Sequence, residues 1–190
     1  NTAKSQTAEN KKKLGRSIEE RPESVELRNE FGHWEIDSVL GLKNENEPVV
    51  ITLVERMTRM CLWIKAKNHT AEAMQEAFED VVSVFLSKKN QVFKTVTGDN
   101  GSEFTTLADF EKYGMSVYFT HPYTSCEKGT NECHNKMLRR FIPKGNPISS
   151  YTAEDICYFA DCINGLPRKI LRYRTPEELF EQELDKIYAA

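Results

Sequence analysis

Hydrophobic and polar positions along this chain repeat with two different periods, and each period predicts one type of secondary structure. Between residues 33 and 40 the period is two, so that Trp34 and Ile36 share one face while Glu35, Asp37 and Val39 share the other. β-Branched and aromatic residues dominate further short runs that are bounded by turn residues. These runs predict four more strands, at residues 49–54, 60–66, 92–97 and 115–120.

Segments with helical spacing separate and follow these strands. After Thr70 the apolar positions recur three or four residues apart and form a stripe of Met74, Phe78, Val81, Val82 and Phe85. A short helix is expected at 109–113, and longer helices are expected to begin at three caps, namely Thr130 (or Asn131), Thr152 and Thr175. This order of elements predicts an α/β fold with a mixed five-stranded sheet flanked by helices.

Composition divides the chain into two parts. Residues 1–30 are polar, lack a sustained period and are interpreted as a tail or linker, whereas residues 31–190 are expected to form one globular core with C-terminal helices. No run approaches 18 apolar residues and no apolar stretch follows the lysines at 11–13, so neither a membrane span nor a signal peptide is expected. Because the first residue is Asn1, we expect that sequence is missing upstream.

Cysteine content and charge restrict the cellular location and the partners. The five cysteines form no CxxC pair, which favours reduced thiols and a cytoplasmic location. Cys126, Cys133 and His134 lie close in sequence, but their spacing matches no common zinc pattern. The net charge of −3 argues against a nucleic-acid partner, whereas the nine Lys or Arg and four Asp or Glu of residues 128–174 argue for a local basic surface.

Three carboxylates stand at positions that suit a divalent metal ion. Asp99 lies in an Asp-Asn-Gly turn directly after a predicted strand, and no strand follows at hairpin spacing. Asp37 stands within a strand that otherwise reads as buried, where an unpaired carboxylate is costly. A salt bridge is the alternative for Asp37, and Glu35 competes for the same role. Glu132 lies in the first turn of a predicted helix, where it would also favour the helix dipole.

These acids fit phosphodiester chemistry. Two Mg²⁺ ions activate an attacking oxygen and stabilise the leaving oxygen of an in-line displacement, and both ions prefer carboxylate ligands. We expect Asp37 to bridge the two ions, Asp99 to hold one and Glu132 the other, with Mn²⁺ as a substitute metal. The chain contains no GxSxG, GxGxxG, P-loop or HExxH motif that would favour another chemistry.

The helix that follows Thr130 is expected to present two different sides. Its core-facing side is predicted to consist of Cys133, Met137, Leu138 and Phe141. Its polar stripe, at positions i, i+3, i+4 and i+7, consists of Glu132, Asn135, Lys136 and Arg139. Asn100 and Asn135 are interpreted as groups that support the metal ligands or contact DNA. Phosphate contacts are predicted for Lys136, Arg139, Arg140 and Lys144.

Several segments resemble the DDE transposases of bacterial insertion sequences, of the insertion-sequence-thirty type. They are IEERP (18–22), FGHWEID (31–37), TGDNGSEF (97–104), HPY (121–123), KGTNECHNKMLRRFIPKG (128–145) and LPRKILRYRTPEELF (166–180). The resemblance runs over most of the chain from about residue 16. Two positions depart from it, since Cys126 stands where relatives tend to carry Trp and Lys128 where Arg is usual.

The resemblance implies a ribonuclease H-like integrase core in which Asp37, Asp99 and Glu132 are the catalytic acids. It also implies Mg²⁺-dependent cutting at transposon inverted-repeat ends and joining of 3′-hydroxyls to a target duplex, by a homo-oligomer assembled on DNA. An N-terminal helix-turn-helix region that reads the inverted repeats is expected to be absent. Two other functions remain open: a nuclease of the same fold that does not join strands, and a non-catalytic DNA- or protein-binding domain retired from transposition.

Overall fold

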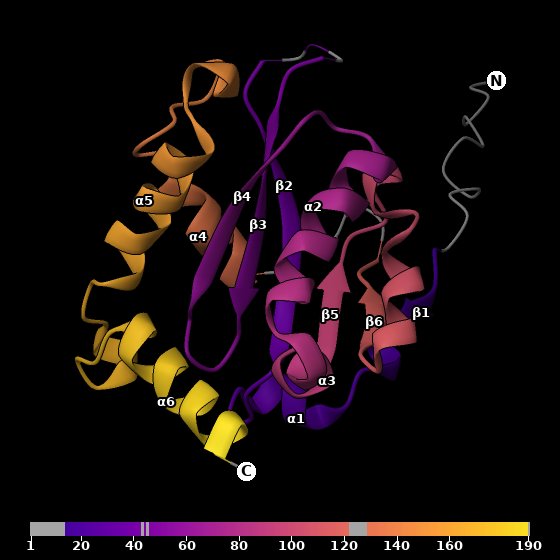
Figure 1. The fold of residues 1–190 in the computed structure, drawn as a ribbon, viewed down its shortest axis with the longest axis vertical. Coiled ribbons are helices and arrows are strands. Elements are labelled where there is room, and N and C mark those ends of the chain that lie inside the picture. Colours follow the sequence, from indigo (N-terminus) through magenta and orange to yellow (C-terminus); the bar gives the residue numbers. More distant parts are fainter. Residues whose placement is uncertain (1–13, 43, 45, 122–128, 190) are drawn as a thin grey trace, which may run out of the picture.

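A six-stranded mixed sheet in the order β1-β6-β5-β2-β3-β4 forms the centre of the structure (Figure 1). The computed structural model describes residues 14–42, 44, 46–121 and 129–189. Strand β2 pairs antiparallel with β3 and parallel with β5, and the β5–β6 and β6–β1 pairs are also parallel. The strands are β1 Arg16–Ser17, β2 His33–Leu40, β3 Val49–Glu55, β4 Cys61–Ala66, β5 Thr95–Gly98 and β6 Ser116–Phe119.

The α/β class is confirmed, but the sheet has one strand more than the five predicted. The additional strand, β1, has only two residues, and a segment this short cannot display an alternating pattern. Strand β5 begins at Thr95 and not at residue 92. Val92 instead ends the short helix α3, where its carbonyl accepts a hydrogen bond from the indole of Trp34 at 2.8 Å.

Thr70, Thr152 and Thr175 directly precede helices as predicted, whereas the helix expected to begin at Thr130 or Asn131 begins at Gly129. Thr70 accepts a hydrogen bond from the amide of Ala73, and Thr152 forms a reciprocal capping box with Asp155. The α-helices are α1 Glu23–Leu27, α2 Ala71–Val84, α3 Lys89–Val92, α4 Gly129–Leu138, α5 Ala153–Asn164 and α6 Pro176–Ala189. The short helix predicted at 109–113 is the 3₁₀ helix η4, Leu107–Tyr113. No helix in these described segments has the length and apolar character needed to span a membrane.

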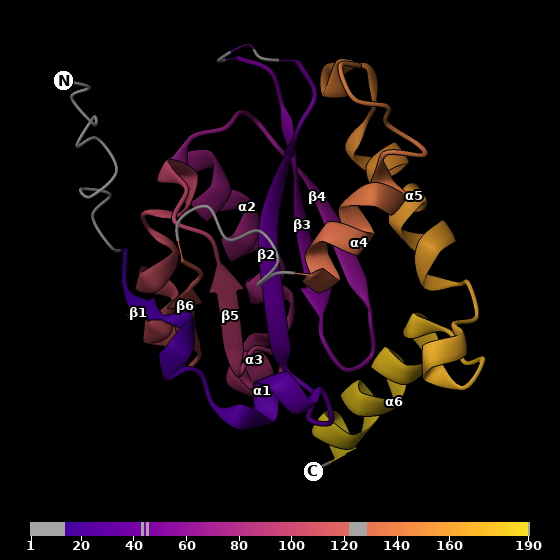
Figure 2. The ribbon, with the colours of Figure 1, turned by 180° about the vertical axis from the view of Figure 1, so that it is seen from behind.

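Each face of the sheet has its own hydrophobic core. Helix α2 covers one face, and α4 and α5 cover the other (Figures 1 and 2). Trp34 and Ile36 belong to the cluster that includes Met74 and Phe78 of α2, whereas Val39 belongs to the cluster that includes Leu138 of α4. The predicted alternation of β2 is therefore confirmed. It places Glu35 and Asp37 on the face of the sheet that α4 covers.

Part of the segment predicted as a polar tail is attached to the core. Residues 16–27 contain β1, the 3₁₀ helix η1 (Ile18–Glu20) and α1. In Figure 2, β1 lies at the left edge of the sheet beside β6, and α1 lies below the sheet. Val25 is fully buried, and its carbonyl accepts a hydrogen bond from Nε of Arg56 at 3.0 Å. The attachment is largely polar, so the hydrophobic pattern of the sequence does not reveal it.

His33 gives the stability of the fold a specific pH dependence. Its ring is buried between the Thr95 hydroxyl, 2.9 Å from Nδ1, and the Glu30 carboxylate, 3.1 Å from Nε2. Burial lowers the pKa of His33 despite Glu30, so the unfolded chain takes up a proton below pH ~6.5 before the folded chain does. Stability from this residue is therefore complete above pH ~6.5 and decreases as the pH falls below it, with a slope of at most about 1.4 kcal/mol per pH unit.

The measurement is the free energy of unfolding in urea at several values of pH between 8 and 5. His33→Gln, which cannot titrate, is expected to show a shallower decrease than the unmodified chain. His121→Gln is the control, because His121 is more exposed and has no comparable burial. Equal slopes in the His33 variant and the unmodified chain would contradict this assignment.

Candidate active site

Asp37 and Asp99 lie on neighbouring parallel elements at the same level of the sheet. Strands β2 and β5 pair in parallel with Glu35 opposite Thr97. Asp37 is two residues beyond Glu35, and Asp99 is two residues beyond Thr97, directly after the end of β5. Since side chains two apart share a face, this register brings both carboxylates to the face of the sheet on which α4 packs.

Helix α4 holds the carboxylate of Asp37 through an amide. Nδ2 of Asn135 donates to Oδ2 of Asp37 at 2.8 Å, and the Oδ1 atom of Asn135 lies 3.0 Å from the hydroxyl of Thr52 on β3. The same hydroxyl lies 3.0 Å from Oδ1 of Asn131. The Thr52 hydroxyl has one hydrogen, so it can donate to only one of the two amide oxygens at a time. Because it lies within hydrogen-bond distance of both, it links Asn131 and Asn135. Asn135 thus orients the Asp37 side chain directly.

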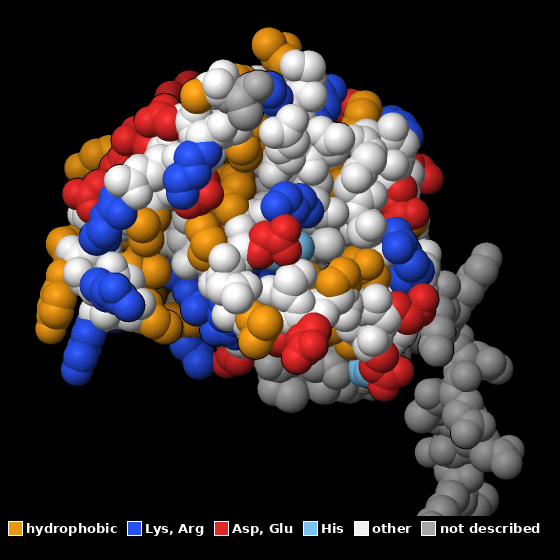
Figure 3. Space-filling view, turned by 90° about the horizontal axis from the view of Figure 1, so that it is seen from below, with side chains coloured by type: hydrophobic (Ala, Val, Ile, Leu, Met, Phe, Trp, Pro, Cys, Tyr) orange, Lys and Arg blue, Asp and Glu red, His pale blue; other side chains and the backbone are white. Residues whose placement is uncertain are grey.

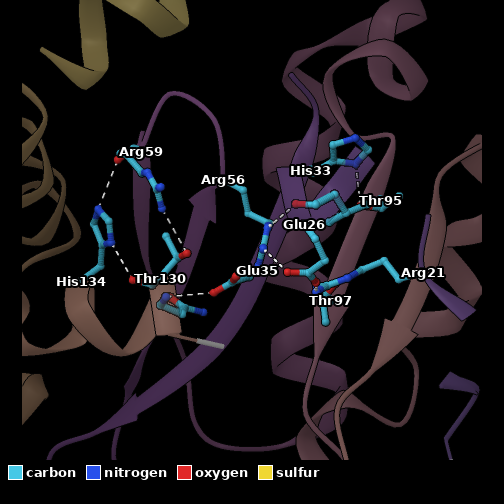
Figure 4. A network of polar contacts seen from close by, with 12 residues as sticks. Arg21, Glu26, His33, Glu35, Arg56, Arg59, Thr95, Thr97, Thr130 and His134 are labelled. Atoms are coloured by element: carbon cyan, nitrogen blue, oxygen red, sulfur yellow. Dashed lines mark hydrogen bonds and ion pairs between the residues drawn. The ribbon is translucent and has the colours of Figure 1, made fainter. Parts of the chain in front are cut away.

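Glu35, the alternative to Asp37, is part of a buried ion pair. Its carboxylate contacts the guanidinium of Arg56, and both side chains are at most 1 % exposed (Figure 4). The second carboxylate oxygen accepts a hydrogen bond from the backbone amide of Asn131 at 2.9 Å, in the first turn of α4. Glu35 is therefore a structural residue that fixes the start of α4 against β2, and it is not available as a metal ligand.

The pair extends toward the N-terminal segment. Arg56 also lies 3.1 Å from the carboxylate of Glu26, which in turn pairs with Arg21. Arg21 donates to the hydroxyl of Thr97 at 3.2 Å, on the strand that leads to Asp99. This chain of charged groups joins α1, β2, β5 and α4, the elements that surround the candidate site (Figure 4).

Glu132 lies next to this anchored turn but faces solvent. Its carboxylate is 2.9 Å from Nζ of Lys136 one turn later, and 52 % of its side chain is exposed. The hydrogen bond to Glu132 raises the pKa of Lys136. Among the described residues, no three His, Cys, Asp or Glu side chains form a group that could hold a metal ion. The strand register therefore places Asp37 and Asp99 on neighbouring elements, and the Glu132 side chain lies on the adjacent helix, paired with a cation.

The turn that carries Asp99 is held in place by several contacts. Oδ1 of Asp99 accepts a hydrogen bond from the amide of Gly101 at 2.8 Å. Nδ2 of Asn100 donates to the carbonyl of Thr120 at the end of β6, and its Oδ1 atom lies 3.4 Å from the amide of Leu14. Asn100 therefore stabilises the turn internally.

Three residues that the sequence analysis did not single out hold the other side of this turn. Glu103 is buried, and its Oε1 atom lies 3.0 Å from the hydroxyl of Ser38 and 2.9 Å from Nε2 of His69. The Ser38 hydroxyl also lies 3.0 Å from the same nitrogen. These contacts connect the turn to β2 directly after Asp37. The only sequence signal for them was the position of Glu103 within the motif that contains Asp99.

The Glu103 carboxylate folds back against Gly101, in the space that a Cβ atom would take. A Cβ atom at this position would lie 2.8 Å from Oε1 of Glu103, although the backbone φ of −67° suits any residue. Gly101→Ala is therefore expected to displace Glu103 from Ser38 and His69 and to lower the free energy of unfolding by about 1–3 kcal/mol. Gly129→Ala is the control, because a Cβ there meets no atom within 4 Å. Chemical denaturation of both variants checks this, and a loss in Gly101→Ala no larger than in Gly129→Ala would contradict it.

The predicted phosphate-binding residues differ in their exposure and in their contacts within the protein. Arg139 is partly buried and donates to the carbonyl of Leu40 at 2.7 Å, and burial lowers its pKa. Arg140 and Lys144 are exposed near the C-terminal end of α4. Lys136, exposed as well, is the partner of Glu132. Arg139 thus connects the C-terminal end of α4 to β2 by a hydrogen bond, while the other three cations face solvent.

The buried side of α4 is more polar than predicted, and the described residues around it contain no group that could hold a metal ion. Thr130, Asn131, His134 and Leu138 are buried, whereas Cys133, predicted to face the core, is exposed. Both ring nitrogens of His134 contact backbone carbonyls, those of Thr130 at 2.8 Å and of Arg59 at 3.2 Å. His134 is therefore used structurally, and Cys126, Lys128 and the residues at 122–125 lie outside the described segments.

Comparison with known proteins shows the family of this chain. Residues 28–125, about half of the chain, match the model of the integrase core domain. The chain belongs to the integrase core domain family. The matched range includes Asp37, Asp99 and the Glu35–Arg56 pair, and it ends before Glu132. The ribonuclease H-like architecture expected from the sequence is accordingly confirmed.

Individual relatives of this integrase core are transposases of insertion sequences. The chain is 43% identical over 171 residues to a probable transposase for the insertion-like sequence element IS1161 of Streptococcus salivarius, covering 90% of this chain and 48% of the relative. It is 36% identical over 170 residues to the transposase for IS4351 of Bacteroides fragilis, covering 89% and 50%. The transposase InsI for IS30A of Escherichia coli is 32% identical over 169 residues, covering 88% and 43%. The chain thus spans about half the length of these curated relatives, and the resemblance to transposases of the insertion-sequence-thirty type is confirmed.

Proposed function

We propose that this integrase core is the catalytic part of a transposase that cleaves DNA strands at the ends of an insertion sequence and joins them to target DNA. Asp37, Asp99 and Glu132 would hold two Mg²⁺ ions, with Mn²⁺ as a substitute. When bound, the ions would supply activation of the attacking oxygen and stabilisation of the leaving oxygen. The DNA partners would be the inverted-repeat ends and the target duplex, and the active form would be a multimer on that DNA.

The single observation that carries this proposal is the parallel register that aligns Asp37 with Asp99 on one face of the sheet. Carboxylate oxygens are hard ligands, which Mg²⁺ and Mn²⁺ prefer. The donor set therefore fits these ions, and it lacks the thiol or imidazole groups that favour zinc. Similarity to transposases over most of the chain supports the choice of strand transfer over simple hydrolysis.

The protein's own residues would contribute orientation and charge. Asn135 fixes the Asp37 carboxylate, and the Gly101 amide fixes that of Asp99. The bond from the Asn131 amide to Glu35 keeps the first turn of α4, and hence Glu132, beside β2. Groups that orient metal ligands in this way reduce the rearrangement of Asp37 and Asp99 on metal binding. Glu132 would have to leave Lys136 and turn toward them.

Incubation with Mg²⁺ or Mn²⁺ and end-labelled duplex oligonucleotides tests the proposal. Metal-dependent nicks together with longer, joined products are expected, and both should disappear in Asp99→Asn. Nicks without joined products would instead select the nuclease of the same fold. Absence of metal-dependent products from the chain, with and without an upstream DNA-reading region supplied by a relative, would overturn the proposal in favour of a retired binding domain.

A further inference from the structure

The loop between α5 and α6 concentrates positive charge without any acidic residue. Residues 165–175 contain four cations, Arg168, Lys169, Arg172 and Arg174, and no Asp or Glu. Seen from below, Lys and Arg side chains interspersed with hydrophobic ones gather on the left of the molecule, where α5 leads into α6 (Figure 3). A surface of this composition is complementary to an array of phosphates.

Two of the four cations make hydrogen bonds that hold the loop, and the side chains of the other two extend into solvent. Arg168 donates to the carbonyl of Ile163 at 3.1 Å and lies 3.4 Å from the sulfur of Met137, and Arg174 donates to Gln182 at 2.7 Å. Lys169 and Arg172 are exposed, and neither side chain has a hydrogen bond or ion pair with any residue in the described ranges. Neither cation therefore holds the loop to the described part of the chain.

Backbone hydrogen bonds hold the loop, and the loop exposes apolar side chains to solvent. The amides of Tyr173 and Leu171 donate to the carbonyl of Arg168 at 2.9 Å, and Arg168 and Arg174 form an isolated bridge. Ile170 is 70 % and Tyr173 71 % exposed. Such a loop loses little conformational entropy on binding, and tyrosine can contact both sugar and phosphate.

Backbone strain in the same loop also indicates binding. Arg172 and Tyr173 are consecutive left-handed residues with φ of 55° and 65°, and neither is Gly, Asn or Asp. Conformations of this kind are unfavourable for bulky residues, and they cluster at ligand-binding sites. The strained conformation here displays a free cation and an exposed aromatic ring side by side.

We propose that residues 166–174 bind the phosphate backbone of duplex DNA beside the candidate active site, without reading base sequence. The inference rests on the proposed function, and it adds a binding surface that is separate from the cations of α4. The contact between Arg168 and Met137 joins the loop to α4, five residues after Glu132. DNA engaged at the carboxylates would therefore continue over this loop.

Fluorescence anisotropy of a labelled duplex of arbitrary sequence, titrated at several salt concentrations, tests this with the full chain. Lys169→Gln/Arg172→Gln is expected to weaken binding about 10- to 100-fold at ~0.1 M salt and to make the slope of log K against log[salt] shallower by about 1.8, the loss of two phosphate contacts. The control Lys88→Gln/Lys112→Gln makes the same change in net charge on η2 (Leu86–Lys88) and η4. Its effect should be small because salt screens remote charges.

The outcomes separate this inference from the function on which it rests. Wild-type binding with an unchanged slope in Lys169→Gln/Arg172→Gln, or an equal loss in the control, would overturn the loop assignment alone. Wild-type protein that binds no duplex at any salt concentration would overturn both. Sedimentation that shows a dimer broken by the loop variant, with DNA affinity unchanged, would assign the loop to a second copy instead.

The variant Arg172→Gly distinguishes a contact between Arg172 and DNA from a role of Arg172 in stabilising the loop. Glycine adopts positive φ readily, so this variant relieves the strain while it removes the cation. We expect a melting temperature that is unchanged or higher together with weaker DNA binding. A lower melting temperature with unaltered binding would show that Arg172 stabilises the loop and does not contact DNA.

Discussion

Replacing Arg56 with methionine is expected to lower the free energy of unfolding by about 3–5 kcal/mol, because it leaves the buried carboxylate of Glu35 without its partner. Both members of the pair are buried, and Arg56 also donates to the carbonyl of Val25. Methionine fills most of the space but supplies neither the charge nor the hydrogen bonds. Urea unfolding followed by tryptophan fluorescence measures the change, since Trp34 lies next to Glu35 on β2.

Lys67→Met provides the matched control for this prediction. Lys67 pairs with Glu76 at 2.7 Å, but the two side chains are 74 % and 57 % exposed. An exposed ion pair contributes about 0–1 kcal/mol, so the control should remain close to the unmodified chain. If both variants lose the same small amount, the Glu35–Arg56 pair does not hold α1, β2 and α4 together.

Asp37→Asn is expected to reduce metal-dependent strand cleavage by about 10³-fold, equivalent to roughly 4 kcal/mol of lost transition-state stabilisation. The substitution leaves an oxygen that can still accept the hydrogen bond from Asn135, so the fold should be retained. The loss therefore reflects the missing carboxylate charge. Initial rates of nicking, with circular dichroism and unfolding of the same samples, measure both effects.

Asp109→Asn is the control for Asp37→Asn, since Asp109 is an exposed carboxylate on η4. It should leave both cleavage and stability unchanged. Cleavage in Asp37→Asn within a few-fold of the unmodified rate would remove Asp37 from the catalytic set. The same loss of cleavage accompanied by unfolding would instead assign Asp37 a structural role.

The elements that bury a hydrophobic stripe were predictable from the sequence. The stripe of α2 and the alternation of β2 both match the structure, because each face packs on one of the two cores. The caps Thr70 and Thr152 were also recognised, since capping depends on residues close in sequence. The two-residue strand β1 was missed, because pairing with β6 depends on contacts about one hundred residues apart.

Buried polar side chains explain why parts of the candidate site could not be predicted from the sequence. Glu35 and Asp37 share a face, so the alternating pattern alone could not distinguish them. The structure does so, because Arg56, 21 positions from Glu35, pairs with Glu35. On α4 the helical periodicity directed Cys133 inward, whereas Asn131 and His134 are buried there. The Asn131 amide donates to Glu35, its Oδ1 atom contacts Thr52, and a ring nitrogen of His134 contacts the carbonyl of Arg59. Hydrophobic periodicity has no means of detecting polar side chains that are buried with partners.

Binding of Mn²⁺ measured by isothermal titration calorimetry tests the central claim most directly, because it requires neither DNA nor an upstream region. The account predicts that the unmodified chain binds Mn²⁺, that Asp37→Asn and Asp99→Asn each abolish or strongly weaken binding, and that the control Asp109→Asn binds normally. Glu132→Gln should weaken binding less, since Glu132 is paired with Lys136 on the helix surface. Unaltered Mn²⁺ affinity in both Asp37→Asn and Asp99→Asn would contradict the assignment of the metal site.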